Sequence, residues 1–312
     1  MHTDVAKTAT VLRPKRFLFF ILPFILCILF FSCTTGKSLG CLPERYSSPP
    51  ETPPHIRSVP LYPEEFIWEP LVSGIQYTSF SNKTSSIEWH LVSIDLSQKE
   101  LQLTAYPSEA EIAPDGSIQG ITVKKYAKKT KAIVAVNASP FNYTGLSIFP
   151  GRRLVGLHVY QGQRLSPPIK KYAALAFFED FEGNYKASIF SDQTLVPSQA
   201  LHAFGGFYTI LKQGEIIDFP ALSFDSRLAA GVSKDGKTLY LLFTPGNFFG
   251  TAGLSFEECA VILSKAGAWE ALQFDGGSSA TMTIEGKNIK KTGFRRVANI
   301  FAFTLSNDTN FN

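Results

Sequence analysis

Alternating apolar and polar positions predict the first strands of the chain. Ile87–Ile94 and Leu101–Tyr106 both follow a two-residue period, and the short, mainly polar stretch between them predicts that they pair as a hairpin. Thr122–Lys131 instead follows a helical period, with its apolar residues on one face and its lysines on the other. Ala132–Val136 is then a buried strand that leads into Asn137.

Strands punctuated by glycine are expected over the middle of the chain. The stretch from Leu154 to Phe219 is rich in β-forming residues and shows no helical period of any length. Leu228–Val232 and Thr238–Phe243 then flank an Asp235-Gly236 pair, and Asp-Gly between two apolar runs is a strong signal for a tight hairpin.

A second helix is expected towards the C-terminal end. Ser255–Ala266 has helical apolar spacing, starts with Ser255 and Glu258 in the register of a capping box, and stops at Gly267. Trp269–Phe274 is then a buried strand. These patterns together predict an α+β fold: a mixed, largely antiparallel sheet with two or three helices, in a single domain after an N-terminal signal and linker.

The N-terminal region has the layout of a secretory signal. Basic residues precede an unbroken apolar run, Phe17–Phe31, which at roughly 15 residues is shorter than the about 20 needed to span a bilayer. Ser32-Cys33 at its end is similar to a bacterial lipobox, in which the cysteine is lipidated and becomes N-terminal after cleavage. We therefore expect a lipoprotein-type signal peptide at residues 1–32, lipidation at Cys33, and export to a bacterial cell-envelope membrane. The alternatives are an uncleaved anchor and ordinary signal cleavage.

A segment rich in proline and serine follows this signal. Residues 33–68 have almost no periodic apolar pattern and predict an extended tether, which leaves residues 69–312 as the folded domain. Of the four cysteines in the chain, only Cys259 lies in that domain, so a disulfide framework is excluded there.

The net charge argues against nucleic acid as a partner. The whole chain carries +4, and residues 1–32 hold four cations and one anion, so the chain after Ser32 carries about +1. The dense basic group at Lys124–Lys131 is more simply the solvent face of the predicted helix. The carboxylates are too scattered to predict a metal site, so no cofactor is identified and a role for a divalent metal stays open.

Candidate chemistry lies at Asp275-Gly276-Gly277-Ser278-Ser279, where a predicted buried strand turns sharply before Ala280–Ile284. Glycines let a ligand approach the main chain closely, and successive amides can accept an anion beside the carboxylate. The same five residues would also suit a plain solvent loop, so the motif by itself does not establish a site.

The order of motifs around this loop resembles the phosphodiester glycosidase family. The matching segments are Ser226-Arg227-Leu228-Ala229-Ala230-Gly231-Val232, Lys234-Asp235-Gly236, Gly253-Leu254-Ser255-Phe256-Glu257-Glu258-Cys259-Ala260, Gly267-Ala268 and Asp275-Gly276-Gly277-Ser278-Ser279-Ala280-Thr281-Met282.

Two flanking segments extend the resemblance over nearly all of the domain. Ala135-Val136-Asn137-Ala138-Ser139-Pro140-Phe141 stands where the family has an Asn-Gly-Gly-Phe-Phe type segment. Arg296-Val297-Ala298-Asn299 is similar to the closing Arg-Pro-Val-Ala-Asn pattern. Ala138 and Ser139 in place of glycines, and Leu228 in place of a threonine, are departures that could alter or narrow the pocket.

The resemblance implies hydrolysis of a glycosyl phosphodiester at the anomeric carbon, with an envelope polysaccharide or glycoconjugate as substrate. Asp275 would stabilise an oxocarbenium-like transition state, attack as the nucleophile or activate water. Arg227 is the first choice and Arg296 the second for holding the phosphate, because a guanidinium grips two phosphate oxygens at once. Asn137 would hydrogen-bond sugar hydroxyls or the phosphate. The remaining expected substrate-binding residues are Gly276, Gly277, Ser278 and Asn299.

Several of these residues also have a structural interpretation. Arg227 could form an ion pair with a neighbouring aspartate, and Asn137 could satisfy backbone amides in a turn. His158 and His202 could act as acid–base groups, but a lone histidine among strands more often packs. Four aromatic residues near the expected loops could stack on a sugar ring, namely Phe141, Tyr143, Phe207 and Tyr208. For the whole chain, the alternative is a non-catalytic carbohydrate-binding or scaffolding lipoprotein with the same fold.

Overall fold

Antiparallel strand pairing organises the protein. The computed structural model describes residues 56–145, 150–219, 223–246, 252–290 and 294–306. Every strand pair found in those residues is antiparallel, and two α-helices accompany the strands. The predicted α+β class is confirmed, but the strands form several sheets rather than the single sheet that the sequence predicts.

The large sheet has eight strands and carries the loops with the candidate chemistry. Its strands, in spatial order, are β1 (Glu69–Val72), β2 (Ile75–Asn82), β3 (Ile87–Asp95), β16 (Thr238–Thr244), β15 (Arg227–Val232), β17 (Glu270–Gln273), β13 (Thr209–Lys212) and β14 (Glu215–Ile216). Residues along β15 alternate between its two faces. Leu228 and Ala230 belong to a core shared with the other sheets, whereas Ala229 packs on the side of helix α2 (Phe256–Ala266).

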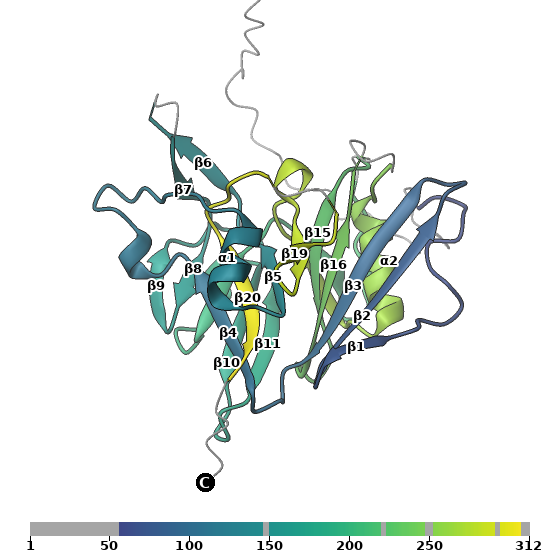
Figure 1. Ribbon diagram of the computed structural model, residues 1–312, viewed down its shortest axis with the longest axis horizontal. Coiled ribbons are helices and arrows are strands. Elements are labelled where there is room, and N and C mark those ends of the chain that lie inside the picture. Colours follow the sequence, from purple (N-terminus) through teal and green to yellow (C-terminus); the bar gives the residue numbers. More distant parts are fainter. Residues whose placement is uncertain (1–55, 146–149, 220–222, 247–251, 291–293, 307–312) are drawn as a thin grey trace, which may run out of the picture. The chain divides into compact units, whose positions relative to one another are not determined.

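Two five-stranded sheets and a hairpin complete the strand structure. The β5 sheet consists, in spatial order, of β19 (Lys287–Asn288), β18 (Met282–Ile284), β5 (Val134–Asn137), β20 (Ile300–Leu305) and β4 (Leu101–Tyr106). The β10 sheet consists of β11 (Tyr185–Phe190), β10 (Ala174–Glu179), β12 (His202–Gly205), β8 (His158–Tyr160) and β9 (Gln163–Ser166). The strands β6 (Phe141–Thr144) and β7 (Gly151–Leu154) form a separate hairpin, at the upper left of Figure 1.

Side chains from these three sheets meet in one hydrophobic core. Phe204 of the β10 sheet stacks on Phe301 of the β5 sheet, with ring centroids 4.8 Å apart. Phe274, directly after β17, has its ring centroid 5.8 Å from that of Phe301. Burial of such rings and their edge contacts stabilise the fold. The core therefore fixes the residue that immediately precedes Asp275.

Both predicted helices form, with their predicted ends. Helix α1 (Val123–Thr130) is capped by Thr122 and packs on the β5 sheet. Helix α2 begins with the capping box at Ser255, ends at Gly267 in the left-handed conformation, and packs on the large sheet (Figure 1). Three single-turn 3-10 helices are also described: η1 (Glu109–Glu111), η2 (Gln193–Leu195) and η4 (Gly277–Ser279).

One of the two predicted hairpins is confirmed and the other is wrong. β15 pairs with β16 around Asp235-Gly236, as predicted. β3 and β4 are both strands, but β3 pairs with β2 and β16 in the large sheet, whereas β4 pairs with β20 in the β5 sheet. A two-residue period shows that a segment is a strand without showing its partner. Leu96, between the two strands, is fully buried in the shared core, so the connection crosses between sheets.

Residues 56–68, which the sequence analysis assigns to the end of the tether, pack on the face of the large sheet that also carries α2. Leu61 is buried, and its carbonyl accepts a hydrogen bond from the Trp89 indole N–H at 2.7 Å. The ring of Phe66 lies edge-on to Trp89, with centroids 5.6 Å apart. Arg57 forms an ion pair with Glu258 of α2 at 2.7 Å. This part of the chain is therefore folded onto the domain.

The predicted signal peptide at residues 1–32, Cys33 and the tether up to residue 55 lie outside the described residues. Within the ranges that the structure describes, no helix combines the length and the apolar character needed to cross a membrane. The lipid anchor therefore stays a prediction from the sequence.

Candidate active site

The loop from Asp275 to Ser279 joins the large sheet to the β5 sheet. It starts directly after Phe274, whose side chain is buried in the core, and it runs through the single turn η4 towards β18. Gly277 has a φ of +55°, which glycine adopts without strain. A Cβ at Gly276 would lie 2.9 Å from the carbonyl oxygen of Ser226, so that position also requires glycine. Gly276 and Gly277 are therefore needed to fold the loop, independently of any role in binding substrate.

From inside the protein, the side chain of Asn137 holds the Asp275 loop, and the side chain of Asn299 holds the backbone at Ser139. Both side chains are buried. Asn137, the last residue of β5, donates to the carbonyl of Asp275 at 2.8 Å and accepts from the amide of Thr281 at 2.8 Å. Asn299 accepts from the Ser139 amide at 3.1 Å and donates to a backbone carbonyl at 2.9 Å. Both asparagines thus fix backbone, which is the structural role considered for Asn137 in the sequence analysis.

The main-chain amides of the loop do not form a continuous anion site. The amides of Asp275, Gly277 and Ser279 each donate to a backbone carbonyl, over distances of 2.8 to 3.1 Å. Donors that are used within the backbone cannot also bind a ligand. Any anion at this loop therefore depends mainly on side chains.

The carboxyl group of Asp275 is the only acidic side chain in this loop. Burial raises the pKa of Asp275, and the nearby Ser279 hydroxyl and Arg295 guanidinium only partly offset this effect. A half-buried carboxyl with a raised pKa just after a strand is typical of a functional site. Among the described residues, no group of three or more histidine, cysteine, aspartate or glutamate side chains is arranged to hold a metal ion.

Arg295, rather than the expected Arg296, faces the loop. Its Nη1 donates to the hydroxyl of the exposed Ser278 at 2.5 Å. The side chain of Arg296 is exposed, and its backbone carbonyl accepts a hydrogen bond from Arg152. The family pattern Arg-Pro-Val-Ala-Asn has one residue between arginine and valine, and counting back from Val297 gives Arg295. This spacing is the sequence signal that points to Arg295.

Arg227 lies beside the loop at Gly276 and is held firmly. A Cβ at Gly276 would lie 3.9 Å from its Nη1. Its Nε donates to the carbonyl of Leu254 at 3.1 Å, its Nη2 donates to Ser223, and the guanidinium carbon is 4.5 Å from the Phe256 ring centroid. In the described part of the chain, it forms no ion pair with a carboxylate. The ion-pair interpretation is therefore not what the structure shows.

The two histidines considered from the sequence are packed. His158 is fully buried and donates from Nε2 to the carbonyl of Pro107 at 2.8 Å, and burial lowers its pKa to about 4. Burial also lowers the pKa of His202 to about 4, and its ring lies parallel to that of Phe204. Neutral, packed imidazoles of this kind support the core rather than transfer protons at the loop.

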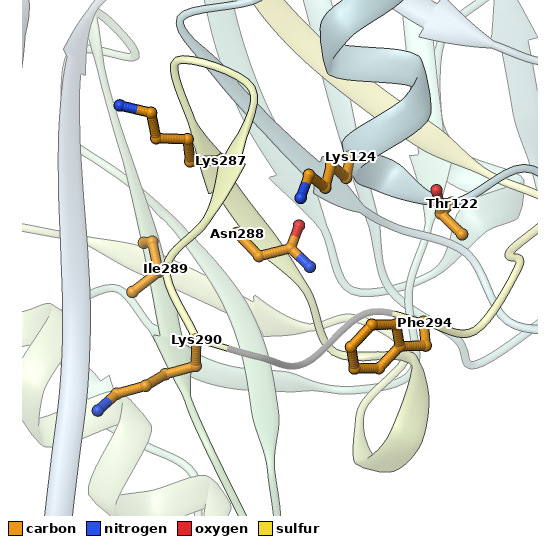
Figure 2. A pocket seen from close by; sticks show the side chains of 7 residues that line it. All are labelled: Thr122, Lys124, Lys287, Asn288, Ile289, Lys290 and Phe294. Carbon is orange, nitrogen blue, oxygen red and sulfur yellow. The ribbon is translucent and has the colours of Figure 1, made fainter.

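A cavity of about 450 Å³ lies between the start of α1 and the β19 strand (Figure 2). It is lined by Thr122, Lys124, Lys287, Asn288, Ile289, Lys290 and Phe294. Figure 2 shows the amino group of Lys124 directed towards Asn288, whereas those of Lys287 and Lys290 point away from it. None of the candidate residues lines this cavity, and it offers no carboxyl group. We therefore place the candidate site at the Asp275 loop.

The fold is shared with proteins of known structure. A hypothetical protein from Synechocystis is 16% identical with a TM-score of 0.56, and the match covers 75% of this chain but only 62% of that one, less than two thirds. A putative exported protein from Burkholderia pseudomallei is 14% identical with a TM-score of 0.57, over 70% of this chain and 74% of that one.

A third solved structure has an enzyme name. The zebrafish N-acetylglucosamine-1-phosphodiester alpha-N-acetylglucosaminidase catalytic domain, auto-inhibited by its pro-peptide, is 16% identical with a TM-score of 0.54. The match covers 81% of this chain and 85% of the zebrafish one. At such low identities, these three likenesses show the fold alone.

Sequence comparison identifies the family. A search of curated proteins finds no match to this chain. A family model described as phosphodiester glycosidase matches residues 130–304, and this region includes the Asp275 loop, both asparagines, Arg227 and Arg295. Because the match covers more than half of the sequence, this chain belongs to the phosphodiester glycosidase family.

Proposed function

We propose that this protein hydrolyses glycosyl phosphodiesters, and that the bond to the sugar breaks beside Asp275. The observation that carries the proposal is the half-buried carboxyl of Asp275, just after a core strand, with the Arg295 guanidinium acting on it. Membership of the family supports the reaction class. The zebrafish relative is named for an N-acetylglucosamine-1-phosphodiester, and we extend that substrate class, a sugar 1-phosphodiester, to this chain.

The proposed reaction adds water across the bond between the anomeric carbon and the bridging oxygen. The carbon–oxygen bond breaks, the oxygen leaves with the phosphate, and water supplies the new hydroxyl of the free sugar and a proton. A phosphate monoester is a good leaving group, so strong general-acid assistance is less necessary than for an alkyl glycoside.

The two charges that develop during this step match the groups at the loop. Positive charge grows on the sugar ring, and an ionised Asp275 stabilises it directly, attacks as the nucleophile or activates water. Because burial raises the pKa of Asp275, its carboxylate is a stronger base than an exposed one. Negative charge grows on the departing phosphate, and the Arg295 guanidinium can bind it through two oxygens.

A sugar 1-phosphodiester is expected to yield free sugar and a phosphate monoester when it is incubated with the purified protein. Phosphorus NMR and a reducing-sugar assay measure the two products. The alkyl glycoside of the same sugar is the matched control, and it should react far more slowly because an alkoxide is a poor leaving group.

The second candidate function is a carbohydrate-binding or scaffolding role without turnover. It is favoured by the engagement of the Asn137 and Asn299 side chains with backbone, which leaves fewer groups to orient a substrate. A folded protein that binds sugar 1-phosphodiesters but releases no sugar from any of them would establish this function instead.

We also propose that the protein is exported and anchored to a cell-envelope membrane through a lipid on Cys33. The support is the basic segment, the apolar run Phe17–Phe31 and the Ser32-Cys33 junction. The substrate would then be an envelope polysaccharide or glycoconjugate, or another extracellular glycosyl phosphate.

Cys33→Ser is expected to abolish lipid-dependent processing, because serine has no thiol to acylate. The unprocessed chain should be larger on a gel and should change its partitioning into detergent. Processing at the same position and unchanged membrane association in the Cys33→Ser variant would contradict lipidation at Cys33.

A further inference from the structure

Two guanidinium groups lie over the same pair of aromatic rings on the β6–β7 hairpin. The guanidinium carbon of Arg152, in β7, is 5.5 Å from the Phe141 ring centroid and 5.2 Å from that of Tyr143. The guanidinium carbon of Arg295 is 5.1 Å and 5.6 Å from the same two centroids. Aromatic faces attract cations but do not neutralise them. The hairpin therefore gathers two positive charges in one place.

The described part of the protein compensates these charges only in part: the Asp275 carboxyl acts on Arg295 from nearby, without an ion pair. Arg152 is only 8% exposed, and it donates to the backbone carbonyls of Arg296 and Pro150. The Nε of Arg295 is buried without a hydrogen-bond partner among the described residues. Neither guanidinium forms an ion pair with a described carboxylate. Buried charges are normally paired, so this arrangement is suited to an anionic ligand.

The electrostatics of Arg152 agree with this conclusion. Burial lowers the pKa of Arg152, Tyr143 opposes that effect, and Arg296 and Arg295 add to it because like charges repel. A bound anion would relieve both the desolvation and the repulsion. The hydrogen bond from Arg295 to Ser278 connects the pair to the Asp275 loop.

We propose that Arg152 and Arg295 together form the binding site for the phosphate group of the substrate. The proposal rests on the proposed function and deepens it, since it assigns Arg152, which no sequence motif marks, as a further binding residue. The phosphate of a diester carries one negative charge, and the monoester that leaves carries nearly two at neutral pH. Two guanidiniums therefore bind the departing group more strongly than the substrate, which favours bond breaking.

The position of the Arg152 guanidinium depends on Gly120, and a substitution at Gly120 can therefore test the proposed phosphate site. A Cβ at Gly120 would lie 2.4 Å from the Cζ, Nε and Nη1 atoms of Arg152. Gly120→Ala therefore displaces the guanidinium without removing its charge. Arg153 is the matched control, because it follows Arg152 in the same strand, is exposed, and donates to the carbonyl of Asp115.

The experiment is a calorimetric titration of the purified full-length protein with inorganic phosphate, which measures the dissociation constant for phosphate. Arg152→Gln, Arg295→Gln and Gly120→Ala are each expected to weaken phosphate binding roughly ten- to a hundredfold, as expected for loss of a charge-assisted hydrogen bond. Arg153→Gln should change the affinity by less than about twofold, because an exposed charge contributes little. Sugar release by Arg152→Gln should fall in parallel with phosphate affinity.

An unchanged phosphate affinity in folded Arg152→Gln would overturn the site. Equal weakening by Arg153→Gln would also overturn it, because the effect would then be one of overall charge. If Arg152→Gln fails to fold in a melting experiment, Gly120→Ala decides the question with the arginine still present. A wild-type protein that binds phosphate through Arg152 and Arg295 but releases no sugar would contradict the proposed function and leave this site intact.

Discussion

Asp275→Asn is expected to lower the rate of sugar release from a glycosyl phosphodiester by about 10²- to 10⁴-fold, the range that a positioned acid–base group contributes. The amide keeps the size of the side chain but cannot carry the negative charge that opposes the developing oxocarbenium ion. The turnover number at saturating substrate measures this loss, and binding of phosphate at the arginine pair should be retained.

The same substitution is expected to make the protein more stable at neutral pH. Burial raises the pKa of Asp275 above its ordinary value of 3.8, so the folded state favours the protonated carboxyl. The stability that this preference contributes is present below pH 3.8 and is lost as the pH rises through the folded-state pKa. Asparagine resembles the neutral form at every pH. The gain from Asp275→Asn should therefore appear as the pH rises from 3.8 through the folded-state pKa and stay constant above it.

Asp235→Asn provides a control in which the stability at neutral pH is expected to change in the opposite direction. Hydrogen bonds from Ser233 and Lys237 lower the pKa of Asp235, so its ionised form supports the fold above its ordinary value of 3.8. This variant should keep full turnover and lose a little stability at neutral pH. Turnover close to wild type in a well-folded Asp275→Asn protein would remove Asp275 from the mechanism.

Arg57→Ala is expected to destabilise the protein by about 3 kcal/mol, the lower end of the range for a broken buried ion pair. The Glu258 side chain is fully buried, whereas that of Arg57 is 20% exposed. The substitution therefore leaves the Glu258 carboxylate without its charged partner at a site that water reaches only in part. Arg57 also donates from its backbone amide and its Nε to Glu258, at 3.1 and 2.7 Å. Urea unfolding measures the change in the free energy of unfolding.

The double variant Arg57→Ala with Glu258→Gln separates the stranded charge from lost packing. It should recover part of the stability, because glutamine can still cap α2 without carrying a charge. A free energy of unfolding for Arg57→Ala within about 0.5 kcal/mol of wild type would mean that residues 56–68 contribute no more than an ordinary surface segment does.

The candidate site was partly predictable. The Asp275 loop, Arg227 and both asparagines lie in motifs that resemble the family, and the structure brings these motifs together around one loop. Arg295 could also be predicted, because the spacing of the family's Arg-Pro-Val-Ala-Asn pattern points to it. Arg152 was not, because Gly151–Leu154 has the composition of an ordinary short strand and no motif marks it.

The amino-acid sequence by itself determined the local elements of this protein. The helix caps at Thr122 and Ser255, the stop at Gly267 and the Asp235-Gly236 turn all act within a few residues, so their effect can be derived without knowing the fold. Tertiary structure decided what depends on distant segments. It placed β3 and β4 in different sheets, and it turned Asn137 towards the backbone of a loop 138 residues away. It also set Arg152 and Arg295 over the same rings, because those contacts arise only when segments remote in the chain pack together.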